Sequence, residues 1–267
     1  MNTENYEEAA EEFLELASQI RLNILFELLK KKSRVTPMAK KLGATAQEVH
    51  RNFDRMSNSG FVAKDKDGAY YITTFGKAIC SQIPSIIYLS KNKKYFENHN
   101  FGNLPIKFVR RMGDLQNSKH VTGVSRVLEV WKSIYKNADE YIFTVLSETP
   151  LELIELVIKR VKKGARYKHI ISENAKIPKG RKKLLDKIGF YPLLEQGKIE
   201  RRMMKDVKIM VILNEKEGVL MFPSKQGDAD MREMFYSNDS AFHEWCLDYF
   251  RHCWNASDPF REFKLKE

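Results

Sequence analysis

The stretch VTPMAKKLGATAQEVHRNFDRMSNSGFVAKDKDGAYYIT, residues 35–73, decides how the first part of the chain folds. Pro37 near its start and Gly43 further on bracket a short helix, because proline fits a first helical turn and glycine fits the position just past a last one. Thr45 and Glu48 then have the spacing of a capping box, which starts a second helix. The stretch therefore predicts two short helices joined by a tight turn.

The second helix is predicted to extend from Thr45 to Asn58, and its two faces differ in chemistry. Arginine can donate two hydrogen bonds to guanine in the major groove of DNA, and asparagine or glutamine can pair with adenine. Glu48 and Asp54 oppose this interpretation, since a carboxylate that faced a phosphate would be repelled. The face expected inside consists of Ala46, Val49, Phe53 and Met56, and the side chains expected outside are Gln47, His50, Arg51, Asn52, Arg55 and Asn58.

A hairpin is predicted directly after this helix. Residues 61–63 and 69–72 are rich in aromatic and β-branched side chains, which is typical of strands. Asp67 and Gly68 between the two runs tolerate the positive φ that a tight turn requires. The pattern therefore indicates two short antiparallel strands.

Lys64 and Lys66 would lie on that hairpin and contact phosphates, which set position and salt dependence rather than sequence choice. Residues 13–28 add an upstream helical stripe, so the order of elements is that of a winged helix-turn-helix. The alternative is a solvated helix pair on an ordinary small domain. The predicted DNA-binding residues are Thr45, Gln47, His50, Arg51, Asn52, Arg55, Lys64 and Lys66.

The composition agrees with a polyanionic partner. The chain has 267 residues and a net charge of +11, and 43% of its residues are hydrophobic. Lysines and arginines outnumber acids by 11 to 4 over residues 30–80 and by 17 to 6 over residues 155–208. No apolar run reaches the ~18 residues of a membrane helix, and the acidic start does not look like a signal peptide, so we expect a cytoplasmic protein. Three cysteines do not make a disulfide framework.

The patterns divide the chain into three expected parts. Residues 1–80 form the winged helix-turn-helix, residues 81–135 a helical connector, and residues 136–267 an α/β domain with one mixed sheet, so the fold class is α+β or α/β. An apolar helix in the connector is expected to dimerise, since such DNA readers bind paired half-sites; packing against the first helix is the alternative. The apolar residues of that helix are Ile83, Ile86, Ile87 and Leu89.

The α/β part is predicted from a strand and helix order of β-α-β-α-β-β-β-α after residue 140. Thr149 is expected to cap a helix that has Pro150 in its first position. Residues 214–218 are expected to form the hairpin loop between the last two strands.

Three stretches, HNFGNLPIKFVRRMGDL (99–115), GVLMFPSKQGDAD (218–230) and SNDSAFHEWCLDYFRHCW (237–254), resemble archaeal transcription regulators of the methanogenesis-regulator type. The resemblance covers nearly the whole chain. It implies an N-terminal winged helix-turn-helix, a C-terminal effector domain that receives a signal, and a dimeric cytoplasmic regulator.

Two groups in the C-terminal part could carry chemistry. In HEWCLDYFRHC (243–253), the two cysteines share a helix face with large apolar residues, so core packing competes with a metal or redox role. The basic segments KGRKK (179–183) and ERRMMK (200–205) could bind an anionic effector or DNA, or be a solvated surface. Arg201 or Arg202 is the better ligand candidate, because a strand directs alternate residues to one side. The effector-binding residues expected from the architecture are Phe143, Arg202, Phe222 and Trp245.

An enzyme and an RNA-binding module are the rival functions. The chain has no GxxxxGK[ST] loop, GxGxxG turn, HExxH, CxxC pair or HxK signature of phospholipase-D-like phosphodiesterases, so we expect no catalytic residue, cofactor or metal. A nucleophile with a distant histidine would leave no such motif. RNA binding would require exposed stacking aromatics, for which Tyr167 and Tyr191 are the candidates.

Overall fold

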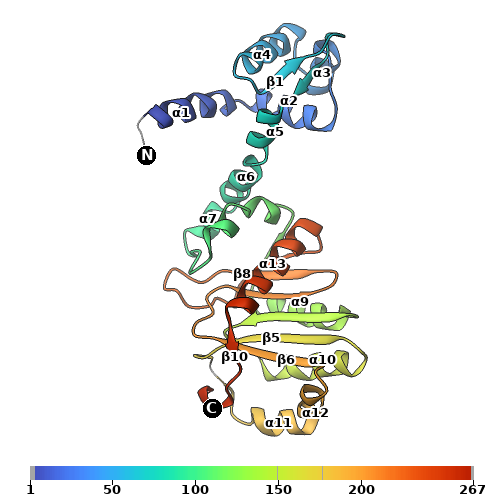
Figure 1. Ribbon diagram of the computed structural model, residues 1–267, viewed down its shortest axis with the longest axis vertical. Helices are drawn as coiled ribbons and strands as arrows, with labels where there is room; N and C mark the ends of the chain where they lie inside the picture. Colours follow the sequence, from blue (N-terminus) through green and yellow to red (C-terminus); the bar gives the residue numbers. More distant parts are fainter. Residues whose placement is uncertain (1–3, 149, 176, 266–267) are drawn as a thin grey trace. The chain divides into compact units, whose positions relative to one another are not determined.

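The structure, a computed structural model, describes residues 4–148, 150–175 and 177–265 (Figure 1). The chain forms two compact units, Met1–Pro84 and Ser85–Glu267. No helix in these described ranges is long and apolar enough to cross a membrane.

The first unit contains the predicted elements in the predicted order. A helix-turn-helix is followed by a two-stranded antiparallel hairpin, in which Val62 lies opposite Ile72. Ser33 adds one bridge beside Tyr70, with the Tyr70 N–H donating to the Ser33 carbonyl at 2.8 Å. The elements are α1 (Glu4–Leu16), α2 (Gln19–Lys30), α3 (Val35–Leu42), α4 (Ala46–Asn58), β1 (Val62–Lys64), β2 (Tyr70–Ile72) and α5 (Thr74–Cys80).

The turn between α3 and α4 follows from two residues. Gly43 has a φ of 62°, in the left-handed region that glycine tolerates, and it ends α3. The Thr45 hydroxyl accepts a hydrogen bond from the Glu48 N–H at 3.1 Å, which confirms it as the cap of α4. Gly68 likewise has a positive φ, 80°, in the hairpin turn. These local signals were readable in the sequence because each acts within three or four residues.

The second unit is built on one mixed sheet of eight strands, in the order β10-β6-β5-β4-β7-β8-β9-β3. Strand β4 is parallel to β5, and β5 is parallel to β6, whereas the other pairs are antiparallel. The strands are β3 (Lys119–Thr122), β4 (Tyr141–Leu146), β5 (Arg166–Ser172), β6 (Ile199–Met204), β7 (Met210–Asn214), β8 (Gly218–Met221), β9 (Glu233–Ser237) and β10 (Asp258–Pro259).

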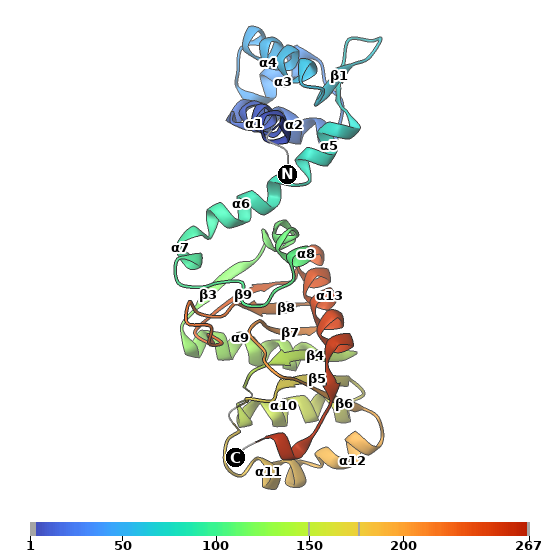
Figure 2. The same cartoon turned by 60° about the vertical axis from the view of Figure 1, so that its left-hand side comes forward.

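Helix α13 (Ser240–Ala256) covers one face of this sheet, and α9 (Val124–Asn137) and α10 (Leu151–Lys162) cover the other (Figure 2). Thr149, the expected cap of α10, lies outside the described residues, and Pro150 precedes the first helical position. The remaining helical segments are α6 (Ile83–Lys91), α7 (Lys93–Phe96), α8 (Ile106–Val109), η1 (Met112–Leu115), α11 (Arg181–Ile188), α12 (Phe190–Glu195) and η2 (Glu262–Lys264).

The core of the second unit extends beyond the predicted α/β part. Tyr88, Phe108 and Trp131, from the predicted connector, are buried in the same apolar cluster as the sheet. The apolar face of α13 also lies in this cluster, including Cys246 and Cys253. Burial raises the pKa of the Cys253 thiol to about 11 and that of Cys246 further, so both cysteines are held as packed thiols.

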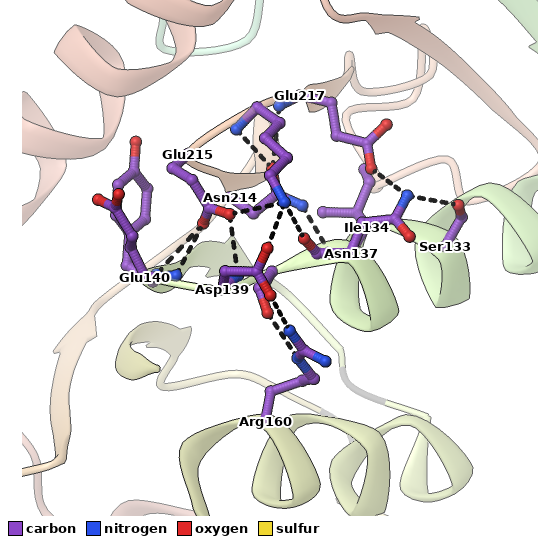
Figure 3. Close-up of polar contacts among 12 residues, drawn as sticks. Ser133, Ile134, Asn137, Asp139, Glu140, Arg160, Asn214, Glu215 and Glu217 are labelled. Atoms are coloured by element: carbon purple, nitrogen blue, oxygen red, sulfur yellow. Dashed lines mark hydrogen bonds and ion pairs between the residues drawn. The ribbon is translucent and has the colours of Figure 1, made fainter. Parts of the chain in front are cut away.

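The turn between β7 and β8 fixes several segments of this unit (Figure 3). The side-chain oxygen of Asn214 accepts hydrogen bonds from the backbone N–H groups of Lys216 and Glu217, at 2.8 and 2.9 Å. Its amide nitrogen donates to the Ile134 carbonyl in α9 at 2.8 Å. Asn214 is fully buried, so these partners take the place of water for both the oxygen and the nitrogen of its side-chain amide. The Glu215 carboxylate adds bonds from the backbone N–H groups of Asp139, Glu140 and Tyr141.

We expect Asn214→Ala to lower the free energy of unfolding of the second unit by about 1–3 kcal/mol, because it strands buried donors and an acceptor. Tryptophan fluorescence during urea unfolding measures this unit selectively, since Trp131, Trp245 and Trp254 all belong to it. Asn238→Ala, at an exposed position, is the control and should change stability by less than about 0.5 kcal/mol. Equal stability of the two variants would show that the turn does not anchor the unit.

Candidate nucleic-acid interface

Helix α4 is anchored by one face and presents the other to solvent. Val49, Phe53 and Met56 are fully buried. The Phe53 ring stacks on the Tyr70 ring of the hairpin, with centroids 4.0 Å apart and planes 1° apart. This stack fixes the helix against β2, so the direction of the outer face is set by the core.

The outer face of α4 carries a shallow hollow of about 550 Å³. Gln47, His50 and Arg51 are exposed, as predicted from the periodicity. His50 and Asp54 form an exposed pair, with Nδ1 and Oδ2 2.8 Å apart, so the Asp54 side chain has a partner within the helix. The side chains that line the hollow are Thr45, Gln47, Glu48, His50, Arg51 and Asp54.

Asn52 was expected outside, and that prediction is wrong. Its side chain is buried, with 6% of the residue exposed, and its amide donates to the Glu48 carbonyl at 2.9 Å. The bond spans one helical turn and satisfies the amide inside the unit. Asn52 therefore holds the helix and cannot reach a base edge from this position.

Arg55 is exposed as expected, but its guanidinium is already engaged. It donates to both oxygens of Glu15 in α1, at 2.7 to 2.9 Å. The hydrogen bond from Arg55 is the largest cause of the lowered pKa of Glu15, and the same bond raises the pKa of Arg55. The partner is 40 residues away in the sequence, so no local pattern could reveal it.

The hairpin presents Lys64 and Lys66, both exposed as predicted. The Lys64 ammonium lies over the Tyr70 ring, 5.5 Å from its centroid. At the start of the hairpin turn, Asp65 pairs with Lys32 at 2.7 Å, and this bond lowers the pKa of Asp65. The pairing offsets Asp65, so the remaining charges of the hairpin are Lys64, Lys66 and the exposed Asp67, a net +1.

The four residues expected to bind an effector are not brought together by the structure. Arg202 donates to the Ser257 hydroxyl at 2.9 Å, and Phe143 stacks on Phe250 at 4.6 Å, both on the sheet face that α13 covers. Trp245 is fully buried and donates to the Phe108 carbonyl at 3.2 Å. Phe222 is fully buried within a separate aromatic group, formed by Tyr95, Phe96, Phe101 and Phe235.

A histidine–carboxylate pair is the feature of the second unit that most resembles enzyme chemistry. His99 and Asp230 are both buried, with Nε2 and Oδ2 3.3 Å apart. The other ring nitrogen of His99 lies 2.9 Å from the Tyr95 carbonyl, and the ring stacks on Tyr95 at 3.8 Å. Both nitrogens are therefore committed within the fold, which is typical of a structural histidine.

No protein-family model matches the chain, and no curated protein matches it. Among solved structures, TrmBL2, an archaeal chromatin protein, is 13% identical with a TM-score of 0.43, and the match covers 97% of this chain and 100% of that one. The phospholipase D family member NUC from Salmonella typhimurium is 14% identical with a TM-score of 0.40, and the match covers 55% of this chain and 100% of that one. NucT from Helicobacter pylori is 14% identical with a TM-score of 0.41, and the match covers 54% of this chain and 99% of that one.

Likenesses at this level do not decide the family or the function of the chain. The resemblance to methanogenesis-type regulators therefore stays a prediction. No histidine of the chain is followed two positions later by lysine, so the HxK signature of phospholipase-D-like enzymes is absent from the sequence.

The Glu15–Arg55 pair makes the attachment of α1 dependent on pH. The folded-state pKa of Glu15 is lowered, so the stabilisation is complete above its ordinary value of 4.5 and is lost as the pH falls through the lowered value. Hydrogen-exchange protection of α1 amides, measured from about pH 6 to about pH 3, should drop in that range. Glu15→Gln should remove the drop and Glu11→Gln, an exposed acid of the same helix, should retain it. A drop that persists in Glu15→Gln would contradict the assignment.

Proposed function

We propose that the chain is a sequence-specific DNA-binding transcriptional regulator that inserts α4 into the major groove. The observation that supports this most directly is the two-sided chemistry of α4. Val49, Phe53 and Met56 on its inner face are fully buried, although Ala46, also expected inside, is exposed; Gln47 and Arg51 are exposed on its outer face. A major groove admits one α-helix, and these side-chain types can pair with adenine and guanine.

Arg51 is the strongest candidate for a base reader. No ion pair or hydrogen bond of its side chain is found within the described part of the chain, whereas Arg55 is held by Glu15. To bind a base or a phosphate, Arg55 would first have to break its hydrogen bonds with both carboxylate oxygens of Glu15. We therefore assign direct readout to Arg51 and Gln47, and phosphate contacts to Lys64 and Lys66.

Dimerisation is the second part of the proposal. Helix α6 buries Ile83 and Tyr88 but leaves Ile86 52% and Ile87 44% exposed. Two adjacent isoleucines on a helix surface favour burial against a partner. A second copy of the chain fits this face, because two-fold related readers bind two half-sites of one operator.

The second unit would then act as the effector domain of a cytoplasmic regulator. A signal bound there can alter DNA binding only if it favours one conformation of the dimer over another. RNA binding is less well supported, because Tyr167, one of the two candidate stacking aromatics, is 6% exposed.

We expect Arg51→Ala to weaken binding to the selected operator by about 1–3 kcal/mol and to leave binding to unrelated duplexes nearly unchanged. Lys66→Ala should instead weaken binding to every duplex and flatten the salt dependence by about one unit of slope. Fluorescence anisotropy at several salt concentrations separates the two effects, with an operator selected from a random duplex pool by the native protein.

Arg126→Ala, at an exposed position of α9, is the control for the loss of one positive charge. If Arg51→Ala behaves like Arg126→Ala on the selected operator, α4 is not the reader.

We expect Ile87→Asp to convert a dimer of the 31.2 kDa chain into a monomer, because a carboxylate cannot be buried there without a partner. Light scattering at micromolar concentration measures the mass. Ser125→Asp, at an exposed polar position of α9, is the control for an added carboxylate and should stay dimeric. A native chain that is already monomeric at that concentration would refute this part of the proposal.

A further inference from the structure

Three polar side chains lie in one row on the sheet face opposite α13. Thr144, His169 and Arg201 are cross-strand neighbours on β4, β5 and β6. Successive residues of a strand point to opposite faces, so Arg201 faces away from Arg202. The Thr144 hydroxyl and the His169 Nδ1 are 2.8 Å apart, which orients the imidazole within the row.

Two guanidinium groups meet in this row. The Arg201 side chain is 9% exposed and that of Arg181, from α11, is 10% exposed. The Arg201 guanidinium lies over the Phe260 ring at 3.8 Å and is 5.2 Å from the centroid of Phe190. Aromatic faces on a buried guanidinium attract its charge and exclude water.

The carboxylate that faces these groups comes from the last part of the chain, which runs beside α11 (Figure 2). Glu262 of η2 accepts from Arg181 Nη1 at 2.7 Å through one oxygen and from Arg201 Nη1 at 3.1 Å through the other. Burial raises the pKa of Glu262, but the two arginines outweigh burial and the net shift is downward. Glu262 is therefore an ionised carboxylate bridging two cations.

This arrangement leaves positive charge and one donor uncompensated. Arg201 Nε is buried, and no hydrogen-bond partner for it is found among residues 4–148, 150–175 and 177–265. Burial, helped by the two arginines, lowers the pKa of His169 to about 3, so the imidazole is neutral and two cations face one anion. A guanidinium fork binds a carboxylate best through two parallel bonds, whereas Glu262 takes one bond from each arginine.

The space around these groups is apolar and nearly closed. Its free volume is about 30 Å³, room for about one water molecule, and its apolar wall includes Ile154, Ile171, Leu185 and Phe190. The Glu262 carboxylate occupies both guanidinium groups of this space, so a larger anion could bind the two arginines together only if the segment with Glu262 moved away. That segment is attached by the two residue pairs of β10 with β6 and by an ion pair between Lys264 and Glu173.

We propose that this pocket binds a small organic carboxylate with an apolar body, and that Glu262 occupies its anion position in the empty state. The incoming carboxylate would accept hydrogen bonds from Nε and Nη1 of Arg201 together. It would also accept the Arg181 hydrogen bond that Glu262 now accepts. Its apolar body would take the place of Phe260 against the cluster of Ile171, Ala175 and Met203. The regulatory consequence rests on the proposed effector role of the second unit, but the binding itself does not.

The test uses phenylacetate as the probe and the neutral phenylacetamide as its matched control, titrated into the full chain by calorimetry. Glu262→Gln removes the internal competitor and should bind phenylacetate at least ~10-fold more tightly than the native chain. Adding Arg201→Lys to that variant should lose at least ~10-fold, because lysine has no planar fork. Phenylacetamide should bind neither protein.

Glu129→Gln, an exposed acid on α9, is the control for lost negative charge and should bind as the native chain does. If the double variant does not fold by circular dichroism, Arg181→Lys on the Glu262→Gln background provides the same comparison. Equal affinity of Glu262→Gln and the native chain, or equal binding of the amide, would overturn the proposal. Tighter binding of inorganic phosphate than of phenylacetate would overturn the carboxylate assignment. An operator affinity that bound phenylacetate leaves unchanged would refute the effector role and leave the anion site standing.

Discussion

The stack of Phe53 on Tyr70 is the contact on which the proposed DNA interface depends. It joins the middle of α4 to the hairpin at a centroid distance of 4.0 Å, inside a core where Val49 and Met56 are fully buried. Because α4 is locked on that side, rotation about its axis cannot bring its inner residues out. The outer face, with Gln47 and Arg51, keeps one direction relative to the hairpin lysines, and fixed geometry of this kind is what sequence readout requires.

Ion pairs within the first unit decide which basic side chains remain available to bind DNA. Glu15 engages Arg55, and Asp65 engages Lys32, whereas Arg51, Lys64 and Lys66 stay exposed on α4 and the hairpin. In the second unit cations outnumber their partners, since two buried arginines share one carboxylate and Arg201 Nε has no acceptor among the described residues. A buried donor left without a partner costs about 1–3 kcal/mol, which a better-placed anion would recover.

The sequence predicted well those features that depend on neighbouring residues. The cap at Thr45, the turn at Gly43 and the β7–β8 turn at Asn214 each act over a few positions. It failed at Asn52, because helical periodicity does not show that an amide can be satisfied by a carbonyl one turn earlier. Strands β3, β9 and β10 were not predicted. Strand β3 is short and mostly exposed and lacks an apolar alternation, and β10 has two residues, both exposed. The partners of Arg55, Arg181 and Arg201 lie 40 to 81 residues away, so only the fold could reveal them.

Cross-linking from α4 tests the central claim most directly. The native Cys80, Cys246 and Cys253 are buried, so Gln47→Cys supplies an exposed thiol for a photoactivatable aryl azide. We predict cross-links from residue 47 to bases at one fixed position in each operator half-site, and none from the same label at Glu129→Cys. An operator that is bound at full affinity but gives no cross-link to residue 47 would contradict the account.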